Sequence, residues 1–181
     1  RIVAKVGQLY ADLSEAGAAG AARAIMTTDT FAKGASVTIN IGGKPVEIVG
    51  FAKGSGMIAP DMATMLVYIA TDANVDQGLL QSILSDLNEG TFNSITVDSD
   101  TSTSDSLMLV ATGQSDAPRI TDLDNVDAQA FTAGLREVML DLSHQVVRDG
   151  EGATKFLEVT VRGAASDTSA KTVGLAIANS P

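Results

Sequence analysis

Residues 37–48 read Val-Thr-Ile-Asn-Ile-Gly-Gly-Lys-Pro-Val-Glu-Ile, with apolar side chains at alternate positions on both sides of a glycine pair. Such alternation indicates strands with one buried face, and a glycine pair favours a tight turn between them. The stretch therefore predicts a β-hairpin, which makes a sheet the framework for the rest of the chain.

The segments around this hairpin predict further strands and several helices. Met65 to Ala70 form an unbroken apolar run, typical of a strand buried on both faces. Residues 128–147 repeat apolar side chains at three- and four-residue spacing, which predicts the longest amphipathic helix. Weaker patterns predict helices within residues 2–26, 79–87 and 167–178, and strands at 95–98, 107–112 and 157–161. Because strands and helices come in clusters and not in strict alternation, we expect an α+β fold with a mixed or antiparallel sheet.

The composition is that of one globular unit with no polyanionic partner. The 181 residues include 45% hydrophobic and 19% charged side chains, enough to bury a single core. A net charge of −10 argues against nucleic-acid binding. No stretch approaches the roughly 18 uncharged apolar residues of a membrane span, and no secretory signal is evident, so we expect no membrane partner and a cytoplasmic location. With no cysteine and one histidine, His144, we expect no metal site.

A glycine-containing loop at residues 53–63 ends at Thr64, directly before the apolar run. A nucleophile that needs neither cysteine nor histidine is the simplest basis for covalent catalysis in this chain. If the Ala63–Thr64 bond is cut, the freed α-amine, with a pKa of ~7.7 to 8.0, can take the proton of the threonine hydroxyl. The alternative is that Thr64 only begins a buried strand, which its residue type alone favours.

Two short motifs are typical of other classes of protein. Gly54 to Ala59 fit a relaxed G-x-G-x-x-A dinucleotide pattern, but Pro60 and the β-like run after it do not form the helix that a Rossmann site requires. Asp98 to Ser102 are similar to an aspartyl-phosphate phosphatase motif, although a polar turn between two strands explains the same residues. A nucleotide-binding or phosphatase domain is therefore a distant alternative.

Five segments, in order along the chain, resemble one enzyme family. They are Ala-Arg-Ala-Ile-Met-Thr-Thr-Asp-Thr (22–30), Lys-Gly-Ser-Gly-Met-Ile-Ala-Pro-Asp-Met-Ala-Thr-Met-Leu (53–66), Ile-Thr-Val-Asp-Ser-Asp-Thr-Ser-Thr (95–103), Val-Arg-Asp-Gly-Glu-Gly-Ala-Thr-Lys-Phe (147–156) and Ala-Ile-Ala-Asn-Ser-Pro (176–181). Together they resemble the ornithine acetyltransferase family, also called glutamate N-acetyltransferase, whose members cut themselves at an Ala-Thr bond. The resemblance implies an N-terminal-nucleophile-like acyltransferase fold, a layered sandwich of helices and sheets.

The resemblance also implies how the chain is divided. Residues 1–63 would end the α chain before autocleavage, and residues 64–181 would begin the β chain, both within one compact unit. The α and β chains of one precursor are expected to assemble as a heterotetramer. The oxyanion donors of the family would lie before this chain and further substrate contacts after it. An inactive fragment or pseudoenzyme of the same fold is therefore the second interpretation.

The family's functional residues map onto four positions of this sequence. The resemblance makes Thr64 the catalytic nucleophile after cleavage between Ala63 and Thr64, and it assigns substrate contacts to Thr27, Lys53, Thr64 and Glu151. The implied reaction moves an acetyl group from N-acetylornithine to glutamate in arginine biosynthesis through an acetyl-enzyme, without a cofactor. Acetyl-coenzyme A is a further donor in some members.

Overall fold

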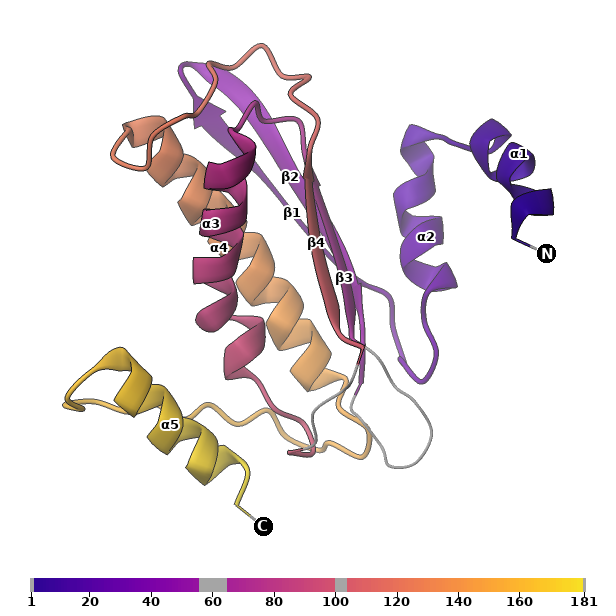
Figure 1. The fold of residues 1–181 in the computed structure, drawn as a ribbon. Coiled ribbons are helices and arrows are strands. Elements are labelled where there is room, and N and C mark those ends of the chain that lie inside the picture. Colours follow the sequence, from indigo (N-terminus) through magenta and orange to yellow (C-terminus); the bar gives the residue numbers. More distant parts are fainter. Residues whose placement is uncertain (1, 56–64, 100–103, 181) are drawn as a thin grey trace.

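A four-stranded mixed sheet forms the centre of the computed structural model, which describes residues 2–55, 65–99 and 104–180 (Figure 1). The strands lie side by side in chain order: β1 (Lys33–Ile41), β2 (Lys44–Lys53), β3 (Leu66–Thr71) and β4 (Ser106–Ala111). Neighbouring strands pair antiparallel from β1 to β3, and β3 pairs parallel with β4. Gly42 and Gly43, at φ +58° and +82°, form the predicted hairpin turn, which glycine enters without strain. The α+β class expected from the sequence is confirmed.

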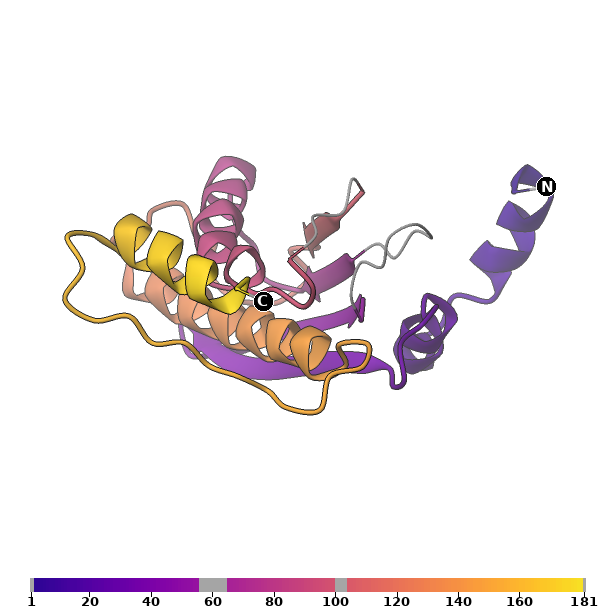
Figure 2. The ribbon, with the colours of Figure 1, turned by 90° about the horizontal axis from the view of Figure 1, so that it is seen from below.

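Two helices cover one face of this sheet. They are α3 (Gln77–Glu89) and α4 (Val126–Arg148), and α4 packs along β1 and β2 (Figure 1). The remaining helices are α1 (Val3–Ala11), α2 (Ala18–Ala24), α5 (Asp167–Ala178) and the short 3₁₀ helices η1 (Glu15–Gly17) and η2 (Phe92–Ser94). Figure 2 shows α5 and α1 at opposite ends of the molecule. Within the described residues, no helix has both the length and the apolar character needed to cross a bilayer.

The core lies between the sheet and α4 because alternate strand residues face that helix. Val46, Ile48, Val67 and Ile69 point inward and form one buried cluster with Phe131 and other helix side chains. Each such side chain contributes roughly 1.5–3 kcal/mol when fully buried.

Two glycines let α4 approach the sheet closely. A Cβ at Gly134 would lie 2.6 Å from Cγ2 of Ile39, and a Cβ at Gly50 would lie 2.9 Å from Cδ1 of Leu142. At contacts this short the neighbouring side chain would have to shift. The spacing between helix and sheet therefore depends on the absence of side chains at these two positions.

Three expectations from the sequence are wrong. Strand β3 is buried on one face only, because Val67 and Ile69 face the core while Ala70 on the other face is exposed. Residues 95–98 and 157–161 contain no strand and run as irregular chain. Apolar alternation is present in both segments, but a strand also needs a neighbouring edge to pair with, and in the described residues neither segment pairs with one.

Candidate functional site

The end of β2 and the start of β3 lie side by side and define one edge of the site. Lys53 is the last residue of β2, and it pairs with Leu66, the first residue of β3. Gly54 follows at φ +149°, a conformation that suits glycine, and a Cβ there would lie 3.5 Å from Cα of Met65. The two ends of the β2–β3 connection are therefore close together.

Met65 is the described residue next to the predicted nucleophile. Its N–H donates to Oδ1 of Asp105 at 2.9 Å, and its carbonyl accepts from the N–H of Ser106 at 3.0 Å. Thr64 and Ala63, the predicted cleavage site, lie outside the described residues. The residue to which Thr64 is covalently joined is thus fixed by β4 and the turn before it.

A buried ionic cluster lies beside the end of β2. It consists of Asp29, Lys33 and Asp149, and we refer to it as the Asp29–Lys33–Asp149 cluster. All three side chains are buried, and Lys33 is 0% exposed. The Lys33 ammonium lies 2.7 Å from Oδ1 of Asp29 and also donates to Oδ2 of Asp149. One cation is therefore shared by two carboxylates from distant parts of the sequence.

Backbone amides and one hydroxyl complete the shell around these carboxylates. Asp29 accepts from the N–H of Gly54 at 2.7 Å and from the N–H of Thr27 at 3.1 Å. Asp149 accepts from the N–H of Thr30 at 3.0 Å and from its hydroxyl. Four donors from two chain segments thus satisfy charges that would otherwise be costly to bury.

These contacts keep both carboxylates ionised. Burial by itself raises the pKa of Asp29, but hydrogen bonds from Lys33, Gly54 and Thr27 outweigh it and hold that pKa below its ordinary value. Burial likewise raises the pKa of Asp149, and the hydrogen bonds from Lys33 and Thr30 reverse the effect, so this pKa is also lowered. Both carboxylates of the cluster are therefore negatively charged near neutral pH.

The structure brings the three described substrate-contact candidates to this same end of the sheet. Thr27 is exposed at the start of the segment that carries Asp29. Glu151 is exposed, and its N–H donates to the carbonyl of Ser55 at 2.6 Å. The hydroxyls of Ser55 and Thr28 are 2.6 Å apart. Three segments distant in sequence therefore meet where β2 ends.

Lys53 is the most unusual of these side chains. It is 3% exposed, yet no hydrogen bond or ion pair joins its ammonium to any residue that the structure describes. Its neighbour Lys33, by contrast, has two carboxylate partners. A lysine this little exposed, whose ammonium has no anionic partner among the described residues, is suited to receive an anion.

The sequence assigned no role to Asp29, Lys33 or Asp149. Asp29 and Asp149 do lie in two of the five segments that resemble the acetyltransferase family, at residues 22–30 and 147–156. The Asp29–Lys33 spacing of four is a common pairing distance in helices, but this segment is not helical. No local signal could therefore have indicated the cluster.

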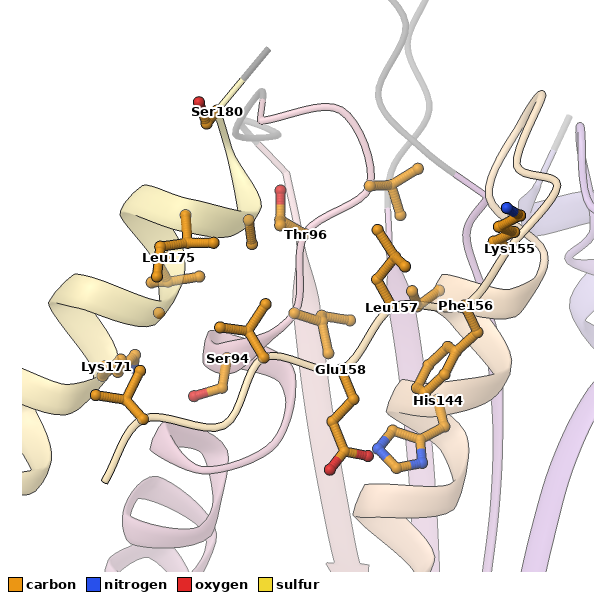
Figure 3. Close-up of a pocket in the computed structure, with 18 of the residues that line it drawn as sticks. Ser94, Thr96, His144, Lys155, Phe156, Leu157, Glu158, Lys171, Leu175 and Ser180 are labelled. Atoms are coloured by element: carbon orange, nitrogen blue, oxygen red, sulfur yellow. The ribbon is translucent and has the colours of Figure 1, made fainter. Parts of the chain in front are cut away.

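A separate hollow of about 560 Å³ lies between α5, the C-terminal part of α4 and residues 153–159 (Figure 3). The ring of His144 meets that of Phe156 edge-on, with centroids 5.2 Å apart. Thr27, Lys53 and Glu151 do not line this hollow. In the part of the chain with described coordinates, histidine and carboxylate side chains form no group of three that could hold a metal ion.

The sheet covered on one face by helices, with a buried ionic cluster at one strand end, defines an α+β protein with its candidate site beside the β2–β3 connection. A profile of the ArgJ family matches residues 1–181, and the chain therefore belongs to the ArgJ family. The family membership expected from the five segments is confirmed.

Two similar relatives and one solved structure agree with this membership. Both relatives bear the name arginine biosynthesis bifunctional protein ArgJ: the protein of Ruegeria pomeroyi is 65% identical and that of Gluconobacter oxydans 55% identical over 100% of this chain. The chain spans 43% of the length of each. The crystal structure of ArgJ from Bacillus halodurans is similar with a TM-score of 0.60 and 42% identity, over 66% of this chain and 55% of that one.

Proposed function

We propose that this chain is part of an acetyltransferase that moves an acetyl group from N-acetylornithine to glutamate in arginine biosynthesis. The observation that carries the proposal is Lys53, an almost buried lysine whose ammonium has no partner among the described residues and which directly precedes the connection that holds Thr64. A substrate carboxylate would supply the missing anion through a charge-assisted hydrogen bond. The arginine-biosynthesis names of the relatives support the same assignment.

In the first proposed step, the chain cuts itself. The Thr64 hydroxyl attacks the Ala63 carbonyl, the new ester bond forms, and the amide bond between the two residues breaks. Water then hydrolyses the ester, which releases the carboxylate of Ala63 and leaves Thr64 with a free α-amine. This step creates the base needed for the second reaction, because the new amine lies on the residue whose hydroxyl it deprotonates.

In the second proposed step, the Thr64 hydroxyl attacks the acetyl carbon of N-acetylornithine. The acetyl–nitrogen bond breaks, the departing ornithine amine takes the proton from the Thr64 amine, and an acetyl ester remains on the enzyme. The amine of glutamate then attacks this ester, and the threonine hydroxyl is restored. No metal or cofactor takes part in this proposal.

The described residues have separate roles in this reaction. Lys53 binds a substrate carboxylate, and the exposed carboxylate of Glu151 binds the cationic amine of ornithine. The exposed hydroxyl of Thr27 forms a further hydrogen bond to the substrate. We also propose that the two chains produced by the cut stay together, assemble as a heterotetramer and act in the cytoplasm. Acetyl-coenzyme A is a further candidate acetyl donor.

Intact-mass spectrometry of the longer natural protein containing this chain tests the first step. We expect two species that divide between Ala63 and Thr64, and one uncut species for Thr64→Ala. A parent that stays uncut, or that transfers no acetyl group from N-acetylornithine to glutamate, would identify the pseudoenzyme alternative and refute the proposal.

Steady-state kinetics of Lys53→Met tests the observation itself. Loss of one hydrogen bond to a charged group is worth about 1.5–3 kcal/mol, so we expect the KM for the bound substrate to rise about 10- to 150-fold. Lys155→Met is the matched control, since Lys155 lines the separate hollow, and its KM should equal that of the parent. Equal KM values for both variants would refute the role of Lys53.

A further inference from the structure

We propose that Asp29, Lys33 and Asp149 are positioning residues, whose cluster sets the relative placement of the three proposed substrate contacts. The inference rests on the proposed function and deepens it, because it concerns how the same site is held together. None of the three side chains is exposed enough to meet a substrate directly. Their action is therefore through the backbone segments to which they bond.

Asp29 connects two of the proposed substrate contacts, Thr27 and Lys53. Its carboxylate accepts from the N–H of Thr27, itself a proposed contact, and from the N–H of Gly54, the residue directly after Lys53. The segment before β1 and the end of β2 thus share one acceptor. A shift of Asp29 would change the distance between Thr27 and Lys53, and with it the spacing of their side chains around a substrate.

Asp149 connects the third proposed substrate contact, Glu151, to the segment before β1. It lies two residues before Glu151 and accepts from both the N–H and the hydroxyl of Thr30. Glu151 is then held to the end of β2 by its N–H, which donates to the carbonyl of Ser55. The segment after α4 is therefore tied on one side to Thr30, before β1, and on the other side to Ser55, just after β2.

Lys33 joins these two arrangements into one. Its ammonium donates to both carboxylates, which without it would be two like charges in a buried place. Buried ion pairs add little net stability compared with apolar side chains of the same size, so stability alone does not explain charges here. Geometry explains the buried charges, because the Lys33 ammonium fixes the distance between the segment carrying Thr27 and the segment carrying Glu151.

Asp29→Asn in the longer natural protein is the test. The amide keeps the shape of the side chain and leaves Lys33 paired with Asp149, but it cannot accept from two amides and an ammonium as a carboxylate does. We expect self-cleavage to slow about 10- to 100-fold, as small misplacements of reacting groups do. Per molecule of cleaved enzyme, we expect the KM for N-acetylornithine to rise by more than kcat falls.

Asp72→Asn is the matched control, because Asp72 also accepts a backbone N–H of β2, that of Glu47, near the strand's opposite end. The control should match the parent in cleavage and in KM. An active parent whose Asp29→Asn variant cleaves and binds substrate as the control does would overturn this inference alone. A parent with neither cleavage nor transfer would overturn the proposed function and this inference with it.

Thr30→Val covers the case in which Asp29→Asn does not fold. It removes one hydroxyl donor to Asp149 at an exposed residue and leaves all three charges in place. A several-fold rise in KM and slower cleavage, at a melting temperature equal to that of the parent, support the inference. Unchanged kinetics at that melting temperature contradict it.

Discussion

Lys33→Met removes the central charge of the buried cluster, and its expected effect on stability can be worked out by comparison with a second lysine. Lys33 and Lys171 each lie 2.7 Å from a carboxylate oxygen, of Asp29 and Glu89 respectively, but Lys33 is fully buried while the side chains of Lys171 and Glu89 are 27% and 64% exposed. Distance is therefore the same and burial differs. A difference between the two variants therefore reports on burial together with the second carboxylate, Asp149, that Lys33 also contacts.

Breaking a buried pair by removing one partner costs about 3–5 kcal/mol, because the remaining charge stays desolvated. Lys33→Met leaves two such carboxylates, so we expect a loss in the upper part of that range or beyond it. Exposed pairs contribute only about 0.2–1 kcal/mol in water. Lys171→Met should therefore lower the free energy of unfolding far less than Lys33→Met does.

Urea denaturation of the longer natural protein, followed by circular dichroism, measures both values. The triple variant Asp29→Asn/Lys33→Met/Asp149→Asn should recover much of the loss, since it leaves no buried charge. If Lys33→Met is no less stable than Lys171→Met, or if the triple variant is less stable than Lys33→Met alone, the unpaired buried carboxylates are not the cause of the loss.

The remaining predictions concern acid and helix packing. The lowered pKa values of Asp29 and Asp149 stabilise the folded chain fully above their unfolded pKa of ~3.9, and this stabilisation is lost as the pH falls through the lower folded values. The melting temperature of the parent should therefore fall more steeply below about pH 4 than that of Asp29→Asn/Asp149→Asn, and parallel curves would contradict the assignment. Gly134→Ala should destabilise the chain: better helix propensity contributes ~1 kcal/mol, but overpacking against Ile39 costs about 1–3 kcal/mol. Gly174→Ala meets its nearest atom at 3.7 Å, so its melting temperature should match or exceed that of the parent, and equal melting temperatures for both glycine variants would contradict the packing argument.

The parts of the fold predicted from the sequence are those that depend on near neighbours. Residues 37–48 predicted the hairpin because alternation and the Gly42–Gly43 turn lie within one short stretch. The long helix at 128–147 was indicated by its spacing, and α4 extends it by two residues at the start and one at the end. The strand predicted at 157–161 is absent, because alternation of apolar side chains does not show whether another strand lies near enough to pair with it.

The residues of the candidate site were likewise predicted only in part. Thr27, Lys53, Thr64 and Glu151 were assigned through the family resemblance, because an isolated threonine, loop lysine or loop glutamate has no distinguishing local pattern. The Asp29–Lys33–Asp149 cluster was missed since its members come together only after α4 packs on the sheet. Long-range contacts of this kind leave no trace in local periodicity.

The distance along the chain between the cluster's members has a consequence for the order of events during folding. Lys33 and Asp149 are separated by 116 residues, so their contact forms only after a long stretch of chain has been closed, at an entropic cost that local elements do not bear. Sheet pairing between β1 and β2 can come early, whereas the connection after α4 arrives late. If self-cleavage depends on this cluster, a nascent or partly folded chain would cut itself slowly. Cleavage at Ala63–Thr64 would then take place only after folding is complete.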